Sequence, residues 1–166
     1  MMPTMSRWHP LAPCSESYFT TAPHVYRFTH DLPVPPARVW ESLTAPNSVA
    51  DWTPLLKSIE WTSDLGLGAT RTVVLPGGAL TMHEYFFAWE EGRRFSFHGT
   101  EATLPLLGRM AEDYLVEPSG AGTRFTWTFA LEGTRRTRLL VKALSPVNRL
   151  NFQRMAGGCE QFFAHG

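Results

Sequence analysis

Residues 24–52, HVYRFTHDLPVPPARVWESLTAPNSVADW, decide the fold of this chain. Apolar and polar residues alternate over positions 26–32, which is the period-two pattern of a half-buried strand. Pro36 suits the first turn of a helix, where a missing backbone N–H costs nothing. Pro46 then ends that helix, because the residue before a proline avoids the helical conformation. The stretch therefore predicts one strand and two short helices, the second of which ends at Trp52.

Six further strands are predicted between residues 56 and 131, because short β-rich runs are separated there by turns such as Pro76-Gly77-Gly78. Strands joined by such short turns pair antiparallel, since parallel pairing needs long crossovers. Residues 137–163 have helical character, and the Ser145-Pro146 pair either kinks this helix or restarts it with Pro146 in a first turn. The pair Gly157-Gly158 either weakens the helix or lets it approach the sheet closely.

A helical wheel of 100° per residue assigns two opposite faces to this last segment. The predicted apolar face consists of Leu140, Leu144, Val147, Met155 and Phe162. The predicted basic face consists of Arg138, Lys142 and Arg149. The basic face is compatible with contact to anionic lipid, but a solvated helix surface is the commoner explanation of such a stripe.

Length and composition narrow the class of protein. The 166 residues are typical of one domain, and we expect residues 24–166 to form it behind a flexible arm at residues 1–23 that is rich in proline. Fifteen basic and fifteen acidic residues give zero net charge, which argues against nucleic acid as a partner. Two cysteines make a disulfide framework unlikely, and no apolar run reaches the length of a signal peptide or membrane span. We therefore expect a cytoplasmic protein without stable membrane insertion.

The order of one strand, two short helices, six strands and a long helix favours an α+β fold in which a curved seven-stranded antiparallel sheet grips the last helix. The run LPVPPARVWESLTAPNSVADW resembles the opening of the START-like (SRPBCC) helix-grip proteins. EYFFAWEEGRRFSF and EDYLVEPSGAGTRFTWTFALEG also resemble strands of this superfamily. It includes the polyketide cyclase/dehydrase and lipid transport group and the major birch pollen allergen. The resemblance covers about residues 24–163 and implies an apolar cavity between the sheet and the last helix.

No metal, dinucleotide, P-loop or nucleophile-elbow motif is present, so no cofactor and no metal is expected. Four polar residues instead fall in phase with apolar strand neighbours: Glu112, Glu84, His30 and Arg71. A buried carboxyl group in an apolar pocket has a pKa near neutral pH and moves protons readily. A structural ion pair between Arg71 and a glutamate, or a charged strand end in water, explains the same pattern. Both faces of strand 80–89 are apolar, so its orientation stays open, and the resemblance favours Glu84 inside.

Apolar side chains from several predicted elements are candidates for the cavity wall, although each also suits an ordinary core. The candidates are Phe28, Trp52, Met82, Phe86, Phe97, Leu104, Leu106, Met110, Tyr114, Trp127, Leu144 and Val147. The loop at residues 100–108 carries several exposed-looking leucines, which suit a pocket gate, an oligomer contact or a membrane-touching tip. The resemblance favours the gate.

Three functions follow from these patterns. The first is binding of a hydrophobic small molecule, such as a lipid or polyketide-like compound. The second is a polyketide cyclase/aromatase-like dehydratase or isomerase, in which Glu112, Glu84, His30 or Tyr114 moves protons and Arg71 stabilises an enolate. The third is an interaction module that uses its sheet or its apolar loop. The identity of the ligand and the oligomeric state, including a homodimer, are left open by the sequence.

Overall fold

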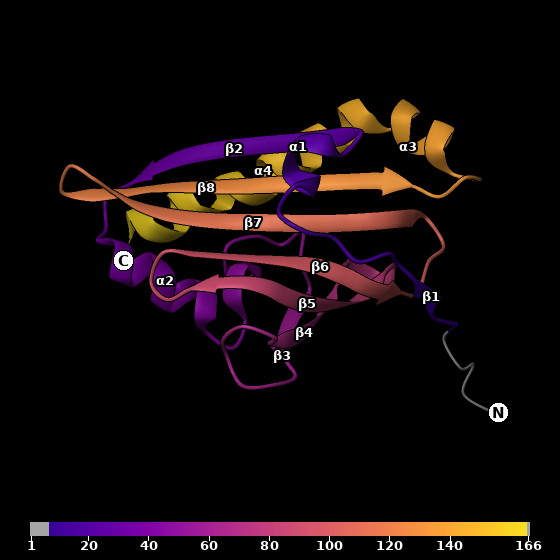
Figure 1. Cartoon of the computed structure of the whole chain (residues 1–166). Helices are drawn as coiled ribbons and strands as arrows, with labels where there is room; N and C mark the ends of the chain where they lie inside the picture. The colour runs from indigo at the N-terminus through magenta and orange to yellow at the C-terminus, as the bar shows by residue number, and fades with distance from the viewer. Residues whose placement is uncertain (1–6, 166) are drawn as a thin grey trace.

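In the computed structural model, which describes residues 7–165, one antiparallel sheet curves against a long C-terminal helix (Figure 1). The strands are β1 (His9–Pro10), β2 (His24–Leu32), β3 (Ser58–Trp61), β4 (Thr70–Val74), β5 (Thr81–Glu90), β6 (Arg94–Ala102), β7 (Leu107–Ser119) and β8 (Gly122–Gly133). The helices are α1 (Tyr18–Thr21), α2 (Pro36–Thr44), α3 (Arg138–Ala143) and α4 (Ser145–Ala164), with 3-10 turns η1 (Ser48–Asp51) and η2 (Pro76–Gly78).

The sheet follows the order β2-β8-β7-β6-β5-β4-β3, and every neighbouring pair is antiparallel. This confirms the predicted fold class, with the two-residue strand β1 added beside β6. Two register irregularities between β5 and β6, next to Glu84 and Phe86, disrupt the ladder locally. Such bulges bend a strand and increase its twist, so they help the sheet to curve around its contents.

The two short helices after β2 lie where proline chemistry predicts them. Helix α2 has Pro36 in its first turn and buries Val39, Trp40 and Leu43 against the sheet. The 3-10 turn η1 then covers the predicted second helix and starts at Ser48, the only non-glycine residue with positive φ (46°) in residues 7–165. The buried Ser48 hydroxyl donates to the carbonyl of Leu43 at 2.6 Å, which holds this tight connection.

The C-terminal segment is two helices, because the Ser145-Pro146 pair restarts the helix. Helix α3 ends before Leu144, and α4 begins at Ser145 with Pro146 in its first turn. Ser145 does not cap α4 with its side chain; its hydroxyl instead shares a 2.5 Å hydrogen bond with the hydroxyl of Tyr26 on β2. The restart thus ties the beginning of α4 to the edge of the sheet.

The predicted apolar face of this segment is wrong, because exposed apolar residues drew the predicted stripe to one side of the residues that pack inward. Of its five members only Met155 is buried, while Leu140, Leu144, Val147 and Phe162 are exposed. The face that packs inward consists of Val141, Met155, Ala156, Cys159 and Phe163. On a wheel of 100° per residue the inward face is rotated by roughly a quarter of a turn from the predicted one, and Val141 and Cys159 coincide, so α3 and α4 keep the same phase across the break.

Gly158 allows α4 to pass very close to the turn after η1. A Cβ atom at this position would lie 2.3 Å from the carbonyl oxygen of Trp52, a distance that real contacts do not reach. A Cβ atom at Gly157 would meet only Cε1 of His30, at 3.9 Å. The expectation of close approach therefore holds for Gly158, although the partner is Trp52 rather than a strand of the sheet.

Residues 7–23, which the sequence predicts to be part of a flexible arm, pack on the sheet in this structure. Strand β1 pairs with β6, and α1 buries Tyr18 and Phe19 against the outer face of β8 and its neighbours. Leu11 joins the main core. The apolar side chains of this proline-rich segment find cover on the sheet, which composition alone does not indicate. Residues 1–6 of the predicted arm lie outside the described residues.

Candidate functional site

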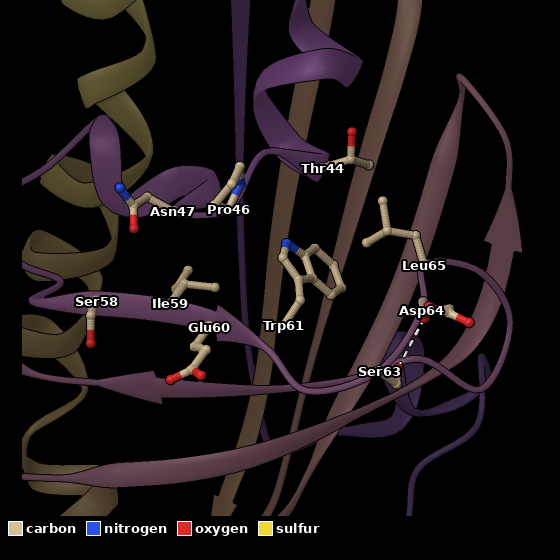
Figure 2. A pocket seen from close by; sticks show the side chains of 10 residues that line it. All are labelled: Thr44, Pro46, Asn47, Ser58, Ile59, Glu60, Trp61, Ser63, Asp64 and Leu65. Carbon is tan, nitrogen blue, oxygen red and sulfur yellow. Dashed lines mark hydrogen bonds between the residues drawn. The ribbon is translucent and has the colours of Figure 1, made fainter.

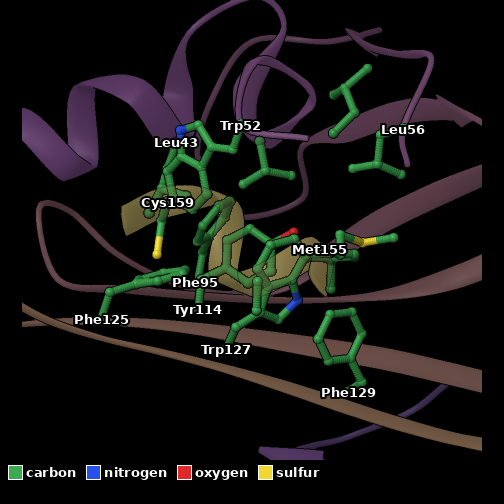
Figure 3. Close-up of a cluster of buried hydrophobic side chains, with 14 of the residues drawn as sticks. Leu43, Trp52, Leu56, Phe95, Tyr114, Phe125, Trp127, Phe129, Met155 and Cys159 are labelled. Carbon is green, nitrogen blue, oxygen red and sulfur yellow. The ribbon is translucent and has the colours of Figure 1, made fainter. Parts of the chain in front are cut away.

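A cavity of about 330 Å³ lies between the sheet and the C-terminal helices. Its walls come from β4, β5, β7 and β8 on the sheet side, and from η1, α3 and α4 on the other. Such a volume is at the lower end of ordinary small-molecule sites and would hold on the order of ten waters. Figure 3 shows Tyr114, Trp127, Phe129 and Met155, four of its lining residues, among the buried side chains of the core.

Strand register brings the polar members of the site together. Arg71 on β4 lies directly opposite Glu84 on β5. Glu112 and Tyr114 are two residues apart on β7 and point to the same face, and Trp127 on β8 lies opposite Tyr114. All five side chains are at least nine-tenths buried and line the cavity. The sequence predicted all five as site residues.

Several contacts fix the position of the Arg71 side chain. Its Nε donates to Oε2 of Glu84 at 2.5 Å, and one terminal nitrogen contacts the Ser48 hydroxyl at 3.5 Å. Its guanidinium also stacks over the rings of Phe97 and Phe86, at 4.3 and 5.0 Å from their centroids. Burial lowers the pKa of Arg71, but attraction to Glu84 and Tyr114 outweighs this effect and raises it.

The structural ion pair that the sequence left open is therefore present between Arg71 and Glu84. Burial raises the pKa of Glu84, while the guanidinium 2.5 Å away favours the ionised carboxylate. A guanidinium does not lose its proton in proteins, and its charge and hydrogen bond oppose the effect of burial on Glu84, so we describe the pair as one positive and one negative charge. The two charges cancel, and the pair adds no net charge to the cavity.

Glu112 is the buried acid without a cation of its own. Burial and the nearby Glu84 carboxylate raise its pKa to about 8, although Arg71, Tyr114 and Trp127 act to lower it. Burial also raises the pKa of Tyr114 well above its usual value, so the Tyr114 hydroxyl keeps its proton, which it directs to Oε2 of Glu112 at 3.4 Å. Glu112 is consequently protonated at neutral pH, so the polar cluster of the cavity, which includes the Arg71–Glu84 ion pair, carries no net charge.

Trp127 supplies a donor that the protein itself does not use. Its indole N–H is buried and has no hydrogen-bond partner within residues 7–165. It lies near enough to the Glu112 carboxyl to lower the pKa of that group, but not in hydrogen-bond geometry. A buried N–H without an acceptor is uncommon in folded proteins, because its desolvation is not compensated. This N–H is available to an acceptor atom of a guest molecule.

The cavity contains six of the twelve predicted wall residues: Met82, Leu106, Met110, Tyr114, Trp127 and Leu144. The orientation of strand 80–89 is now clear, since Met82 and Glu84 face inward while Tyr85 is 39% exposed. Leu106 and Leu107, from the predicted gate, also line the cavity.

The other predicted residues lie elsewhere. Phe86 and Phe97 are fully buried beneath Arg71, and Trp52 packs on Phe125 and Phe163 in the closed part of the core. Phe28, Leu104 and Val147 are outside the cavity lining, and Leu104 and Val147 are exposed. These positions have the predicted strand phase or apolar character, but the cavity occupies only one end of the space under the sheet.

His30 faces α4, as its strand phase predicts, but it is not in the cavity. Its Nδ1 lies 2.7 Å from Oε1 of Glu160 on α4, and its Nε2 is buried without a partner in the described chain. Helix α4 covers this part of β2, so His30 is separated from the cluster around Glu112. Of the four residues predicted as catalytic, Glu112, Glu84 and Arg71 line the cavity.

Several wall residues were missed by the sequence reasoning. Four of them come from one face of α4: Asn148, Asn151, Phe152 and Met155. A wheel of 100° per residue places residues 148, 152, 155 and 159 within one stripe, so the helical period carried a usable signal. Other missed wall residues come from the strands and the turns beside them, such as Val73, Leu80, Phe129 and Leu131. Their apolar character does not distinguish them from ordinary core.

A second hollow of about 580 Å³ lies between the end of α2 and the connection from β3 to β4 (Figure 2). It is shallow and open to solvent, and Trp61 forms its base, with its indole N–H donating to the Ala45 carbonyl at 3.0 Å. The acidic residues at this hollow, Glu60 and Asp64, are exposed. We take the enclosed cavity as the functional site, because only there do buried titratable groups meet an apolar wall.

Two further observations concern the class of site. Residues 7–165 contain no group of three or more His, Cys, Asp or Glu side chains arranged to hold a metal ion. None of the helices in this part of the chain is long and apolar enough to cross a membrane.

Comparison with known proteins gives a family match over most of the chain. The model of a family described as polyketide cyclase / dehydrase and lipid transport matches residues 23–160. Among curated proteins, the uncharacterized protein Rv2574 of Mycobacterium tuberculosis is 36% identical over 136 residues, which cover 78% of this chain and 81% of the relative. The uncharacterized protein Mb2604 of Mycobacterium bovis matches with the same identity and coverage.

Solved structures share the fold at lower sequence identity. TTHA0849 from Thermus thermophilus superposes with a TM-score of 0.68 and 21% identity, covering 83% of this chain and 95% of that one. The Zhui aromatase/cyclase from Streptomyces sp. R1128 superposes with a TM-score of 0.64 and 17% identity, covering 86% and 98%. At these identities the likeness concerns the fold alone.

Proposed function

Because this chain belongs to the polyketide cyclase/dehydrase and lipid transport family, we propose that its cavity binds a hydrophobic small molecule that carries an uncharged oxygen group. One observation supports this most strongly. The unpartnered indole N–H of Trp127 and the protonated carboxyl of Glu112 lie together at one end of an otherwise apolar cavity. A carbonyl or hydroxyl oxygen placed there would accept from both.

The physical balance favours a neutral ligand. Apolar burial supplies about 25 cal/mol per Å² of surface, so most of the affinity would come from the aliphatic and aromatic walls. A carboxylate or phosphate would lie beside Glu84, whose negative charge is already matched by Arg71. Such a ligand would bring an uncompensated charge into a buried site, at a cost of several kcal/mol.

A matched pair of ligands tests this proposal. A methyl naphthyl ketone and the isopropenyl naphthalene of nearly the same shape differ in little besides the carbonyl oxygen, which a CH2 group replaces. We expect both to bind in calorimetric titrations, with the ketone about fivefold tighter, because one neutral hydrogen bond contributes about 1 kcal/mol. Trp127→Phe should remove most of this preference and leave the affinity for the hydrocarbon nearly unchanged.

The control for this substitution is Trp89→Phe, since Trp89 lies in the aromatic core and does not line the cavity. Equal binding of the two naphthalenes to the unmodified protein would contradict the assignment of the polar end. Absence of binding by either compound, in a protein whose cavity is shown empty by native mass spectrometry, would contradict the binding proposal itself.

A second function, dehydration of a β-hydroxy carbonyl compound, is favoured by the pKa of Glu112 at about 8. In one concerted step the protonated carboxyl would deliver its proton to the departing hydroxyl while its other oxygen takes the proton from the carbon next to the carbonyl. The electrons of that C–H bond form the C=C bond, the C–O bond breaks, water leaves and the acid is restored. In such an enzyme Glu112→Gln would abolish turnover while substrate still binds. In a carrier the same variant would retain its ligand with nearly unchanged affinity.

A further inference from the structure

Helix α3 and the first half of α4 expose an unusual number of apolar side chains. Five large apolar residues lie within twelve positions here: Leu139, Leu140, Leu144, Val147 and Leu150. Leu139 is 73% exposed and Val147 is 53% exposed, so these side chains project into solvent rather than forming the margin of a core. We call these five residues the corner patch, because they surround the corner where α3 meets α4. Adjacent exposed apolar side chains of this kind mark interaction surfaces.

The chain segment that carries the corner patch has charge of one sign. Residues 134–159 contain six basic residues and no acidic ones: Arg135, Arg136, Arg138, Lys142, Arg149 and Arg154. The rest of the chain therefore carries nine basic residues against fifteen acidic ones, so the zero net charge hides a strong asymmetry. No salt bridge within residues 7–165 involves any of the six.

The corner patch adjoins the opening of the cavity. Leu144 belongs to the patch, lines the cavity and is 37% exposed, so it stands at the boundary between the two. The Thr137 hydroxyl, just before α3, donates to the carbonyl of Leu106 at 2.6 Å. This bond joins α3 to the β6–β7 loop, which carries the exposed Leu104, and Figure 1 shows the two segments at the same end of the sheet.

We propose that the corner patch docks this protein on an anionic membrane surface. Exposed leucines flanked by basic residues without acidic partners suit the boundary between lipid headgroups and acyl chains, where the apolar side chains enter and the cations meet anionic lipids. A second copy of this chain fits poorly, because two patches of the same positive charge would repel. Docking in this orientation would turn the cavity opening toward the lipid, and this last step rests on the proposed binding of an apolar ligand.

Flotation with lipid vesicles tests the docking. We expect the protein to float with vesicles that contain phosphatidylcholine and phosphatidylserine, to stay behind with phosphatidylcholine alone, and to be released as salt is raised. Leu139→Ser should weaken binding roughly tenfold, since one exposed leucine loses its transfer into the interface. Its matched control is Leu67→Ser, because Leu67 is also 73% exposed but lies on the β3–β4 connection.

The charge contribution is tested in the same assay. Arg138→Gln and Lys142→Gln should each weaken binding to the anionic vesicles about fivefold. Arg38→Gln should have little effect, because Arg38 is an exposed cation on α2 that is remote in sequence from the patch.

Three results would overturn the proposal. One is equal flotation with neutral and anionic vesicles, and another is equal loss of binding in the Leu139 and Leu67 variants. The third is a dimer in analytical ultracentrifugation that Leu139→Ser dissociates, in a protein that does not bind vesicles. The patch would then be a protein–protein interface. Vesicle binding needs no ligand, and the naphthalene titrations need no membrane, so failure of either proposal is seen separately.

Discussion

The buried acid Glu112 makes the stability of this protein depend on pH in a definite direction. Its pKa is about 8 in the folded chain, against an ordinary value of 4.5. Between these two pH values the unfolded chain has released this proton and the folded chain has kept it. The free energy of unfolding therefore falls as pH rises, by about 1.4 kcal/mol for each pH unit, and the loss from this one group approaches 5 kcal/mol at pH 8. Above pH 8 the Glu112 carboxyl is ionised in both the folded and the unfolded chain, so this group no longer lowers the free energy of unfolding as pH rises.

Glu112→Gln removes the titrating group and keeps the approximate shape of the side chain. We expect the variant to match the unmodified protein to within about 1 kcal/mol near pH 4.5, and to exceed its free energy of unfolding by roughly 5 kcal/mol above pH 8. Urea unfolding followed by circular dichroism, repeated from pH 5 to 9, measures this difference directly. Other titrating groups are present in both proteins, so the difference between the two curves isolates Glu112.

Glu117→Gln serves as the control, because Glu117 lies on the same strand but on the opposite face from Glu112. This variant should follow the pH dependence of the unmodified protein. If Glu112→Gln also follows that dependence, the carboxyl group is ionised at neutral pH in the folded state. The neutral-cavity argument would then fail, and with it the preference for an uncharged ligand.

Three further substitutions test close contacts in the buried part of the protein. Arg71→Met should destabilise the protein by about 3–5 kcal/mol in urea unfolding, because it leaves the Glu84 carboxylate buried without its partner; a loss below about 1 kcal/mol would mean that water reaches the pair. Gly158→Ala should lower stability by roughly 1–3 kcal/mol, since the added Cβ would meet the Trp52 carbonyl, whereas Gly157→Ala has room and should be neutral or slightly stabilising. Thermal unfolding of the two alanine variants compares them, and equal effects would show that α4 does not approach the turn so closely.

The sequence by itself determined the architecture, since local patterns specify each element. Proline in the first turn of α2, the break at Pro46, alternating strands and short turns lead to the antiparallel sheet and its covering helix with little ambiguity. It also indicated the inward phase of Glu112, because alternation along β7 leaves only one face for it.

Only the tertiary structure decided which of the inward-facing residues form a site. Alternation assigns a side chain to a face of the sheet, but His30 and Glu112 share the inner face and differ in what lies above them. The rotation of α4 after its restart at Ser145 places one stripe over the sheet and leaves the leucines of the corner patch outside. Periodicity within an element cannot specify its rotation relative to its neighbours, because that rotation is set by packing between segments far apart in the chain.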